Sequence, residues 1–243
     1  MLPRGSVAWR VHGDVTTMMI GGIAGLLLQM LHPLALAGVW DHSNFRQDMI
    51  GRLRRTARFI AITTYGERTA AEAAIERVRR IHLAVNGTLP DGTPYSAADP
   101  RLLAWIHVAG ALCFLDAWIR LMEPAMPRAD QDRYFAEVAD GARRLGADPV
   151  PTTRAEAEAL LRAFIPELVA DERSRSVRDI ILRAKGSPAM IPVERLLTQS
   201  AIDLLPPFAR RMHGLGASGL TRPALFASAR GLARTLQWAL RKG

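Results

Sequence analysis

The sequence has little cysteine and little lysine. Cys113 is the single cysteine in 243 residues, which excludes an internal disulfide, a cysteine-ligated metal cluster and a Cys-x-x-Cys-His site for covalent c-type haem. Lys185 and Lys242 are the only lysines, so 30 of the 32 basic residues are arginines. The formal charge of +9 permits contact with nucleic acid, but the chain has no basic block or nucleic-acid motif. We therefore expect no nucleic-acid partner.

Glutamate is absent from the first 66 residues, because Glu67 is the first in the chain. A carboxylate-bridged di-iron bundle needs Glu-x-x-His pairs, and the sequence contains none. The P-loop motif, the GxSxG motif of hydrolases and the HExxH motif of zinc proteases are also missing. If the protein holds a metal, a histidine-ligated haem is the more natural hypothesis.

The rest of the sequence follows a helical pattern with almost no strand-like alternation. Capping boxes at Thr69-x-x-Glu72 and Thr153-x-x-Glu156 predict two helix starts, and Asp99-Pro100 predicts a third. A loop rich in turn-forming residues covers residues 88–98, and a final amphipathic helix is expected over 221–241. These patterns predict an all-α fold and one domain over residues 1–243.

The segment from Met18 to Trp40 is almost wholly apolar. A membrane span needs about 20 uninterrupted apolar residues, and His32-Pro33 breaks this segment early. We therefore expect a buried core segment, no firm membrane insertion and a cytoplasmic protein.

His82 is the most informative residue for chemistry. Ile75, Val78, Ile81 and Val85 form an apolar stripe at helical spacing, and His82 lies among them. An imidazole that faces a core needs a metal or a hydrogen-bond partner. Periodicity leaves both readings open: an iron ligand, or a core histidine bonded to a neighbouring helix.

Arg52, Arg55 and Thr56 share one face of a predicted helix. Arg52 and Thr56 lie one turn apart, so a guanidinium and a hydroxyl point the same way. That pair suits a carboxylate, a haem propionate or a bound oxygen species, although an arginine-rich solvated helix start would look similar. Phe59 and Ile60 nearby favour a position in the core.

Two further groups of polar residues are candidates for a site. His107 lies in a stretch that is apolar on nearly all sides, which makes it a second candidate ligand or a relay. Asp116 is available to pair with a histidine or an arginine. Asp41-His42-Ser43 has the composition of a plain helix cap.

Six stretches in this order and spacing resemble the catalytic domain of latex-clearing proteins (rubber oxygenases). The same family includes the prenyl-chain-cleaving oxygenase of mycophenolic acid biosynthesis. The resemblance covers roughly residues 20–125 and thins after residue 130. The stretches are Leu28–Pro33, Gly38–Ser43, Gly51–Thr56, Arg77–His82, Asp91–Pro100 and Leu102–His107.

The resemblance implies a globin-like helical fold around haem b and an oxygenase that uses molecular oxygen. Its substrate would be apolar and isoprenoid- or lipid-like. By motif, His82 stands in the place of the proximal iron ligand, and Arg52 and Thr56 in the places of two residues beside the haem. His107 stands in the place of a second recurrent histidine. We predict Arg52, Arg55 and Thr56 as catalytic residues, and an apolar wall of the substrate pocket over residues 23–39.

Two departures from the family pattern keep other functions open. Arg55 stands where rubber oxygenases carry a lysine beside the distal iron position, and a guanidinium is a poor ligand. Residues 26–50 contain no glutamate to act as the base proposed for those enzymes. A non-catalytic haem-binding or haem-sensing protein is therefore one alternative. A haem-free protein that binds lipid or a membrane surface through its final helix is another. That helix carries the basic residues Arg222, Arg230, Arg234, Arg241 and Lys242.

Overall fold

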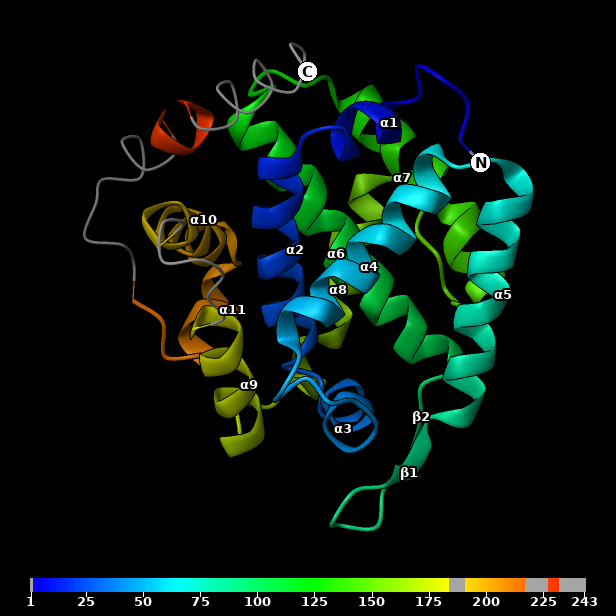
Figure 1. Cartoon of the computed structure of the whole chain (residues 1–243), viewed down its shortest axis with the longest axis vertical. Helices are drawn as coiled ribbons and strands as arrows, with labels where there is room; N and C mark the ends of the chain where they lie inside the picture. Colours follow the sequence, from blue (N-terminus) through cyan, green and yellow to red (C-terminus); the bar gives the residue numbers. More distant parts are fainter. Residues whose placement is uncertain (1, 184–190, 217–226, 232–243) are drawn as a thin grey trace.

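A computed structural model describes residues 2–183, 191–216 and 227–231. Its helices are connected in the order α1 to α11, with one short 3₁₀ helix, η1, and one two-stranded hairpin, β1–β2 (Figure 1). The elements are α1 (Val7–His12), α2 (Val15–Gln29), α3 (Pro33–His42), α4 (Met49–Tyr65), α5 (Arg68–Ala84), β1 (Asn86–Thr88), β2 (Pro94–Ser96), α6 (Pro100–Leu121), α7 (Arg128–Leu145), α8 (Arg154–Phe164), η1 (Ile165–Glu167), α9 (Glu172–Arg183), α10 (Ile191–Leu204) and α11 (Pro207–Met212). The predicted all-α fold class is confirmed.

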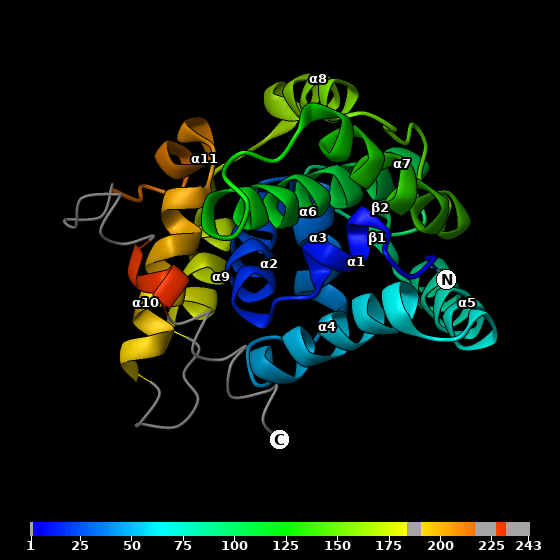
Figure 2. The same cartoon turned by 90° about the horizontal axis from the view of Figure 1, so that it is seen from above.

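The core is built on the close packing of α2 against α6. Figure 2 shows α6 between α2 on one side and α7 and α8 on the other. Glycines on α2 permit this approach, because a Cβ at Gly21 would lie 2.9 Å from both the Cys113 carbonyl oxygen and the Phe114 Cα. Helix α6 consequently carries the largest set of buried residues of any described helix, including Trp105 and Leu115.

The apolar segment from Met18 to Trp40 is split between α2 and α3, which meet at an angle of 104°. Pro33 is the first residue of α3, where its missing N–H costs nothing, and His32 is the N-cap. By length and composition, α6 alone could cross a membrane, as could α2 and α3 if counted as one broken span. Most of the apolar part of α6 is buried against other helices.

The predicted helix starts agree with the structure at two of three positions. Asp99 accepts a hydrogen bond from the Leu102 amide at the start of α6, and Thr153 with Glu156 forms the capping box of α8. The box at Thr69 is wrong. The N-cap of α5 is Glu67, two residues earlier than predicted, and the carboxylate of Glu72 pairs with Arg68 instead of capping the backbone.

One further segment differs from the structure expected from the sequence, and another lies mostly outside the described residues. Residues 86–96 form the β1–β2 hairpin, which overlaps most of the region 88–98 that was expected to be a loop. In the predicted last helix, residues 227–231 are helical. Its remaining residues lie outside the described part of the chain, and so do Arg222, Arg234, Arg241 and Lys242.

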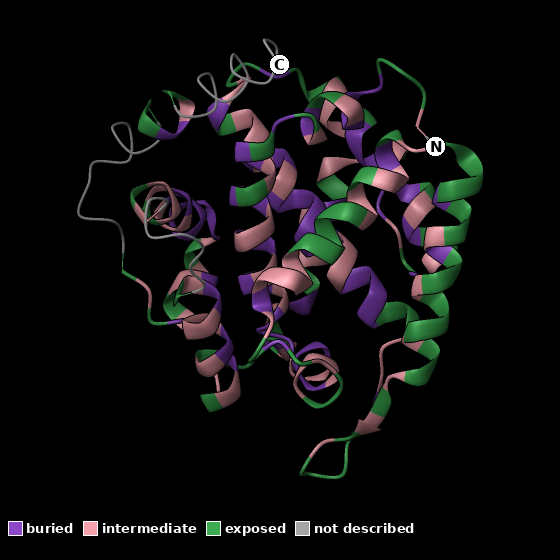
Figure 3. Cartoon of the chain, in the orientation of Figure 1, coloured by how far each residue is buried: buried purple, intermediate pink, exposed green. Residues whose placement is uncertain are grey.

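Helices α4 and α5 form an outer hairpin that diverges from its turn at Gly66 (Figures 1 and 3). Helix α4 packs on α5 and α1, and α5 packs on α4 and α7, whereas α4 is set apart from α6 in Figure 2. Each of the two helices has 17 residues and only two buried ones. This hairpin carries Arg52, Arg55, Thr56 and His82.

Candidate functional site

His82 lies in the last turn of α5, on the side that faces the rest of the protein. Ile75 is buried, and Val78, His82 and Val85 are half-buried. The predicted stripe is wrong at Ile81, whose side chain is 52% exposed. The inward face of α5 is therefore formed by Ile75, Val78 and His82, and Ile81 points to solvent.

The His82 imidazole has an unsatisfied nitrogen. Its Nδ1 is buried, and no hydrogen bond from the described residues reaches it. Burial lowers the pKa of His82, because desolvation penalises the charged ring. The ring is therefore neutral at pH 7, which is the form that binds metals.

Arg52 lies on α4 with its guanidinium largely withdrawn from water. Its Nη1 donates a hydrogen bond of 3.3 Å to the Ser43 hydroxyl, and no carboxylate of the described residues pairs with it. Burial, with a smaller contribution from the charge of Arg55, lowers the pKa of Arg52. A half-buried cation without a counter-ion favours an anionic ligand.

Arg55 and Thr56 have local partners. The Arg55 guanidinium pairs with Asp48 at 3.1 Å, and that carboxylate also caps α4 at the Gly51 amide. The Thr56 hydroxyl donates to the Arg52 carbonyl oxygen at 3.2 Å. A catalytic role for Arg55 or Thr56 stays a prediction.

The middle of α4 lies outside the core. All five residues from Arg54 to Arg58 are exposed, which is more than one full turn of helix. We expected Phe59 and Ile60 to draw this helix into the core, but both are only half-buried. At this turn the expectation is wrong, because α4 packs on α1 and α5 and not closely on α6.

His107 projects from the well-packed helix α6. Its Nε2 is buried and makes no hydrogen bond within the described residues. Burial, with a smaller effect from the positive charge of Arg143, lowers the pKa of His107 to about 4. His107 therefore resembles His82 in being a neutral imidazole with an unused nitrogen.

The structure places these residues on α4, α5 and α6 without direct side-chain bonds between them. Among the described interactions, none joins His82 to Arg52, Thr56 or His107. Asp116, which also lies on α6, pairs with Arg154 at 2.7 Å, which confirms an arginine partner. The predicted apolar wall over residues 23–39 is mostly core, and on α3 the half-buried apolar residues are Leu34, Val39 and Trp40.

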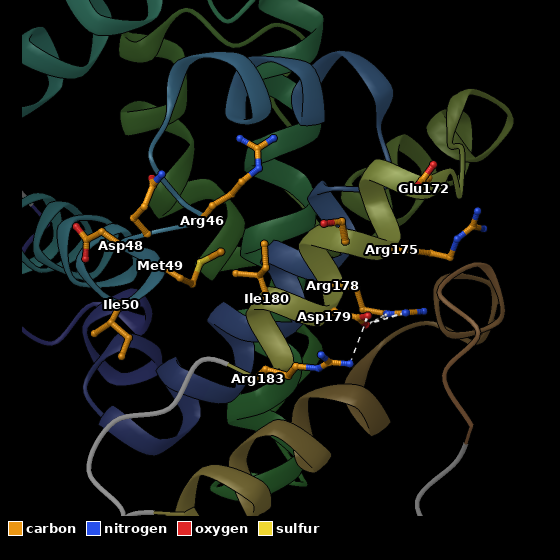
Figure 4. Close-up of a pocket in the computed structure, with 12 residues that line it drawn as sticks. Arg46, Asp48, Met49, Ile50, Glu172, Arg175, Arg178, Asp179, Ile180 and Arg183 are labelled. Carbon is orange, nitrogen blue, oxygen red and sulfur yellow. Dashed lines mark hydrogen bonds and ion pairs between the residues drawn. The ribbon is translucent and has the colours of Figure 1, made fainter.

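Two grooves occur near these helices. One of about 960 Å³ opens between the α3–α4 loop and α9, where Met49 and Ile180 point toward each other (Figure 4). The other, of about 510 Å³, runs between α5 and α7 and reaches Ile75 and Arg79, one turn before His82. The lining of neither groove includes a histidine.

The sequence reading missed a polar cluster that joins α3 to the hairpin after His82. Tyr95 of β2 donates to Asp41 at 2.7 Å, and His42 contacts both the Tyr95 hydroxyl and the Asn86 carbonyl oxygen. Asp41-His42-Ser43 was interpreted as a helix cap. The available signal was Tyr95, an aromatic residue in a segment otherwise typical of an exposed loop.

The side chains present fit a haem better than a metal held by several protein ligands. Within the described residues, no group of three or more His, Cys, Asp or Glu side chains could hold a metal ion. A haem needs only one axial imidazole and favours cations for its propionates. His82, with its unsatisfied buried nitrogen, and Arg52, a half-buried cation, supply those two features.

Comparison with known proteins gave one match. A family model described as "ER-bound oxygenase mpaB/B'/Rubber oxygenase, catalytic domain" matches residues 9–238. No curated protein and no solved structure matches the chain.

Proposed function

The chain belongs to the mpaB and rubber oxygenase catalytic-domain family, and from this premise we propose that it is a haem b-dependent oxygenase. The substrate we propose is a small apolar molecule of isoprenoid or lipid type, with molecular oxygen as co-substrate. The observation that carries the cofactor is the inward-facing imidazole of His82, whose Nδ1 is buried without a hydrogen-bond partner. Haem, when bound, would supply iron for oxygen activation.

His82 would be the residue that binds the haem iron. Its lowered pKa keeps the ring neutral, so that a nitrogen lone pair stays available without competition from a proton. Its place in the last turn of α5 fixes the ring against the half-buried face of that helix. The protein supplies position and a low local polarity, which are the contributions a fold makes to a cofactor.

Arg52 would bind a propionate and orient the cofactor. Its guanidinium is withdrawn from water and has only the Ser43 hydroxyl as a described side-chain partner. A bidentate contact with a carboxylate would satisfy it better than a single hydroxyl. Thr56 lies one turn further along α4 and would present its hydroxyl on the same face. His107 would lie at the edge of the same site as a neutral donor or acceptor.

A haem-binding protein without oxygenase chemistry is the second candidate. The observation that favours it is the pairing of Arg55 with Asp48, which holds that guanidinium at the solvent-exposed start of α4. In the sequence, residues 26–50 contain no glutamate, and arginine stands at position 55. Oxygen consumption by the haem-loaded protein with isoprenoid test substrates would separate the two functions.

The cofactor proposal is tested by His82→Ala. The variant should lose more than 90% of haem uptake, because the iron loses its protein ligand, and added imidazole should restore part of the Soret absorption. Leu83→Ala is the matched control, since Leu83 is the next residue on α5 and is 65% exposed. Full haem content in His82→Ala would disprove the ligand assignment, and a wild type with no Soret band would disprove the cofactor.

A further inference from the structure

We propose that Tyr95 is a positioning residue for His82, and that it acts through a clamp with Asp41 and His42. This inference rests on the proposed function, because the position of His82 matters only if it binds iron. The clamp joins the end of α3 to the strand that begins four residues after His82.

The hydrogen bonds of the clamp are well defined. The Tyr95 side chain is 6% exposed, and its hydroxyl donates to Asp41 Oδ2 at 2.7 Å. His42 Nε2 lies 3.0 Å from the Asn86 carbonyl oxygen and 3.2 Å from the Tyr95 hydroxyl oxygen. A carbonyl oxygen only accepts hydrogen bonds, and the Tyr95 proton is already given to Asp41. His42 Nε2 must therefore carry a proton, which it shares between the two oxygens.

The clamp reaches His82 through a short stretch of backbone. The Val85 amide donates to the His82 carbonyl oxygen at 3.1 Å, and the Ala97 amide donates to the Val85 carbonyl oxygen at 2.8 Å. Asn86 is paired with Ser96 across the hairpin and is held by His42. The end of α5 is thus held by β2 and the residue after it on one side and by the end of α3 on the other. The clamp therefore restricts the translation and rotation of the turn that carries His82.

Gly87 shows how tightly Tyr95 is seated. Gly87 and Tyr95 are partners across the hairpin, and a Cβ on Gly87 would lie 2.6 Å from the Tyr95 hydroxyl oxygen and 2.7 Å from its Cζ. The backbone of Gly87 does not have a positive φ, so only this contact excludes a side chain. Gly87→Ala would therefore push the ring away from Asp41 without backbone strain.

The test compares Tyr95→Phe with Tyr65→Phe. Tyr65→Phe removes one hydroxyl hydrogen bond, to the Trp9 carbonyl oxygen at 2.9 Å at the far end of α4. Tyr95→Phe removes the bond to Asp41 and the bond that the hydroxyl shares with His42. Haem loss to an acceptor globin should be about tenfold faster from Tyr95→Phe than from the wild type, and unchanged in Tyr65→Phe. Gly87→Ala should behave like Tyr95→Phe. In the apo proteins, amide exchange over residues 82–97 should rise in Tyr95→Phe and Gly87→Ala only.

The outcomes separate the two proposals. Haem uptake by the wild type with equal loss rates from Tyr95→Phe and Tyr65→Phe would overturn the positioning role alone. Unchanged exchange over residues 82–97 in Tyr95→Phe would overturn the clamp, whether or not haem binds. A wild type that takes up no haem while its exchange shows the clamp would overturn the proposed function.

Discussion

The buried histidines of this protein differ in how their nitrogens are used. His12 is bonded at both, with Nδ1 2.9 Å from the Thr64 hydroxyl and Nε2 3.0 Å from the Tyr134 hydroxyl. It joins α1, α4 and α7 and needs no further partner. His32, His82, His107 and His213 each keep a buried nitrogen without a described partner. The other nitrogen of His32 lies 3.6 Å from Glu167 and that of His213 lies 2.8 Å from the Leu27 carbonyl oxygen, whereas His82 and His107 make no side-chain hydrogen bond within the described residues. The site proposal depends on this contrast between rings with a partner and two rings with none.

The pH dependence of stability should report on His107. Its pKa is about 4 in the folded chain and 6.5 in its ordinary state, so the unfolded chain binds the proton more readily. The contribution of His107 is complete above about pH 7 and is lost as the pH falls from 6.5 toward 4. Around pH 5, His107 should make the free energy of unfolding fall by about 1 kcal/mol for each pH unit of acidification.

This prediction can be checked with apo His107→Leu. The free energy of unfolding in urea should fall less steeply between pH 7 and pH 5 for the variant than for the wild type. His12, whose pKa is also lowered to about 4 by burial, should give its own slope in both proteins. Parallel curves for the two proteins would show that His107 is not buried in its neutral form.

Residue patterns selected candidates for the site. They drew attention to His82 and His107 as imidazoles among apolar residues and to Arg52 as a guanidinium one turn from Thr56, and their roles stay predictions. They could not predict that Arg55 pairs with Asp48, because the two residues are seven positions apart and Asp48 precedes the helix as its N-cap. They also missed Tyr95, because its partners Asp41 and His42 are more than 50 residues away in the chain.

At the scale of elements, the α2–α6 contact is the one most sensitive to added volume. Gly21→Ala should lower the free energy of unfolding by about 2 kcal/mol, because its Cβ would meet backbone atoms of α6 at 2.9 Å. Gly22→Ala is the matched control. Its Cβ would lie 3.7 Å from Phe114 Cε1, an ordinary contact, and alanine favours helix by about 1 kcal/mol.

Urea unfolding of the two alanine variants would check this pair. The expected changes have opposite signs although the substitutions are adjacent and chemically identical. Equal effects would mean that α2 and α6 lie further apart than described.

The helices themselves were largely predictable from local signals. Asp99-Pro100 and Thr153-x-x-Glu156 mark helix starts, and the physical reason is local hydrogen bonding. The Thr69 box failed because Glu72 has two arginines, Arg68 and Arg144, in reach of its carboxylate. A local sequence motif cannot predict the ion pair with Arg144, because Arg144 lies on another helix.

At the scale of the whole molecule, the protein consists of a tight centre and a loosely packed outer hairpin. Helices α2 and α6 are largely buried, whereas α4 and α5 have two buried residues each. Amide exchange in the apo protein should therefore be faster over α4 and α5 than over α2 and α6. Haem should slow exchange over α4 and α5 and leave α8 unchanged, since α8 carries none of the proposed ligands.

Exchange mass spectrometry with and without haem would check this prediction. Protection confined to α9 and the α3–α4 loop would place the ligand in the 960 Å³ groove instead of beside His82. Uniform protection of all helices would indicate a general gain in stability without a defined site.

Helix α3 contacts two distant parts of the chain, one at each of its ends. At its first end, His32 Nε2 lies 3.6 Å from Glu167, and the Leu31 carbonyl oxygen accepts from the Val169 amide. At its other end, Asp41 and His42 hold the hairpin through Tyr95. Ten helical residues span about 15 Å and resist bending. A shift of the η1–α9 connection would therefore be transmitted through α3 to the β1–β2 hairpin.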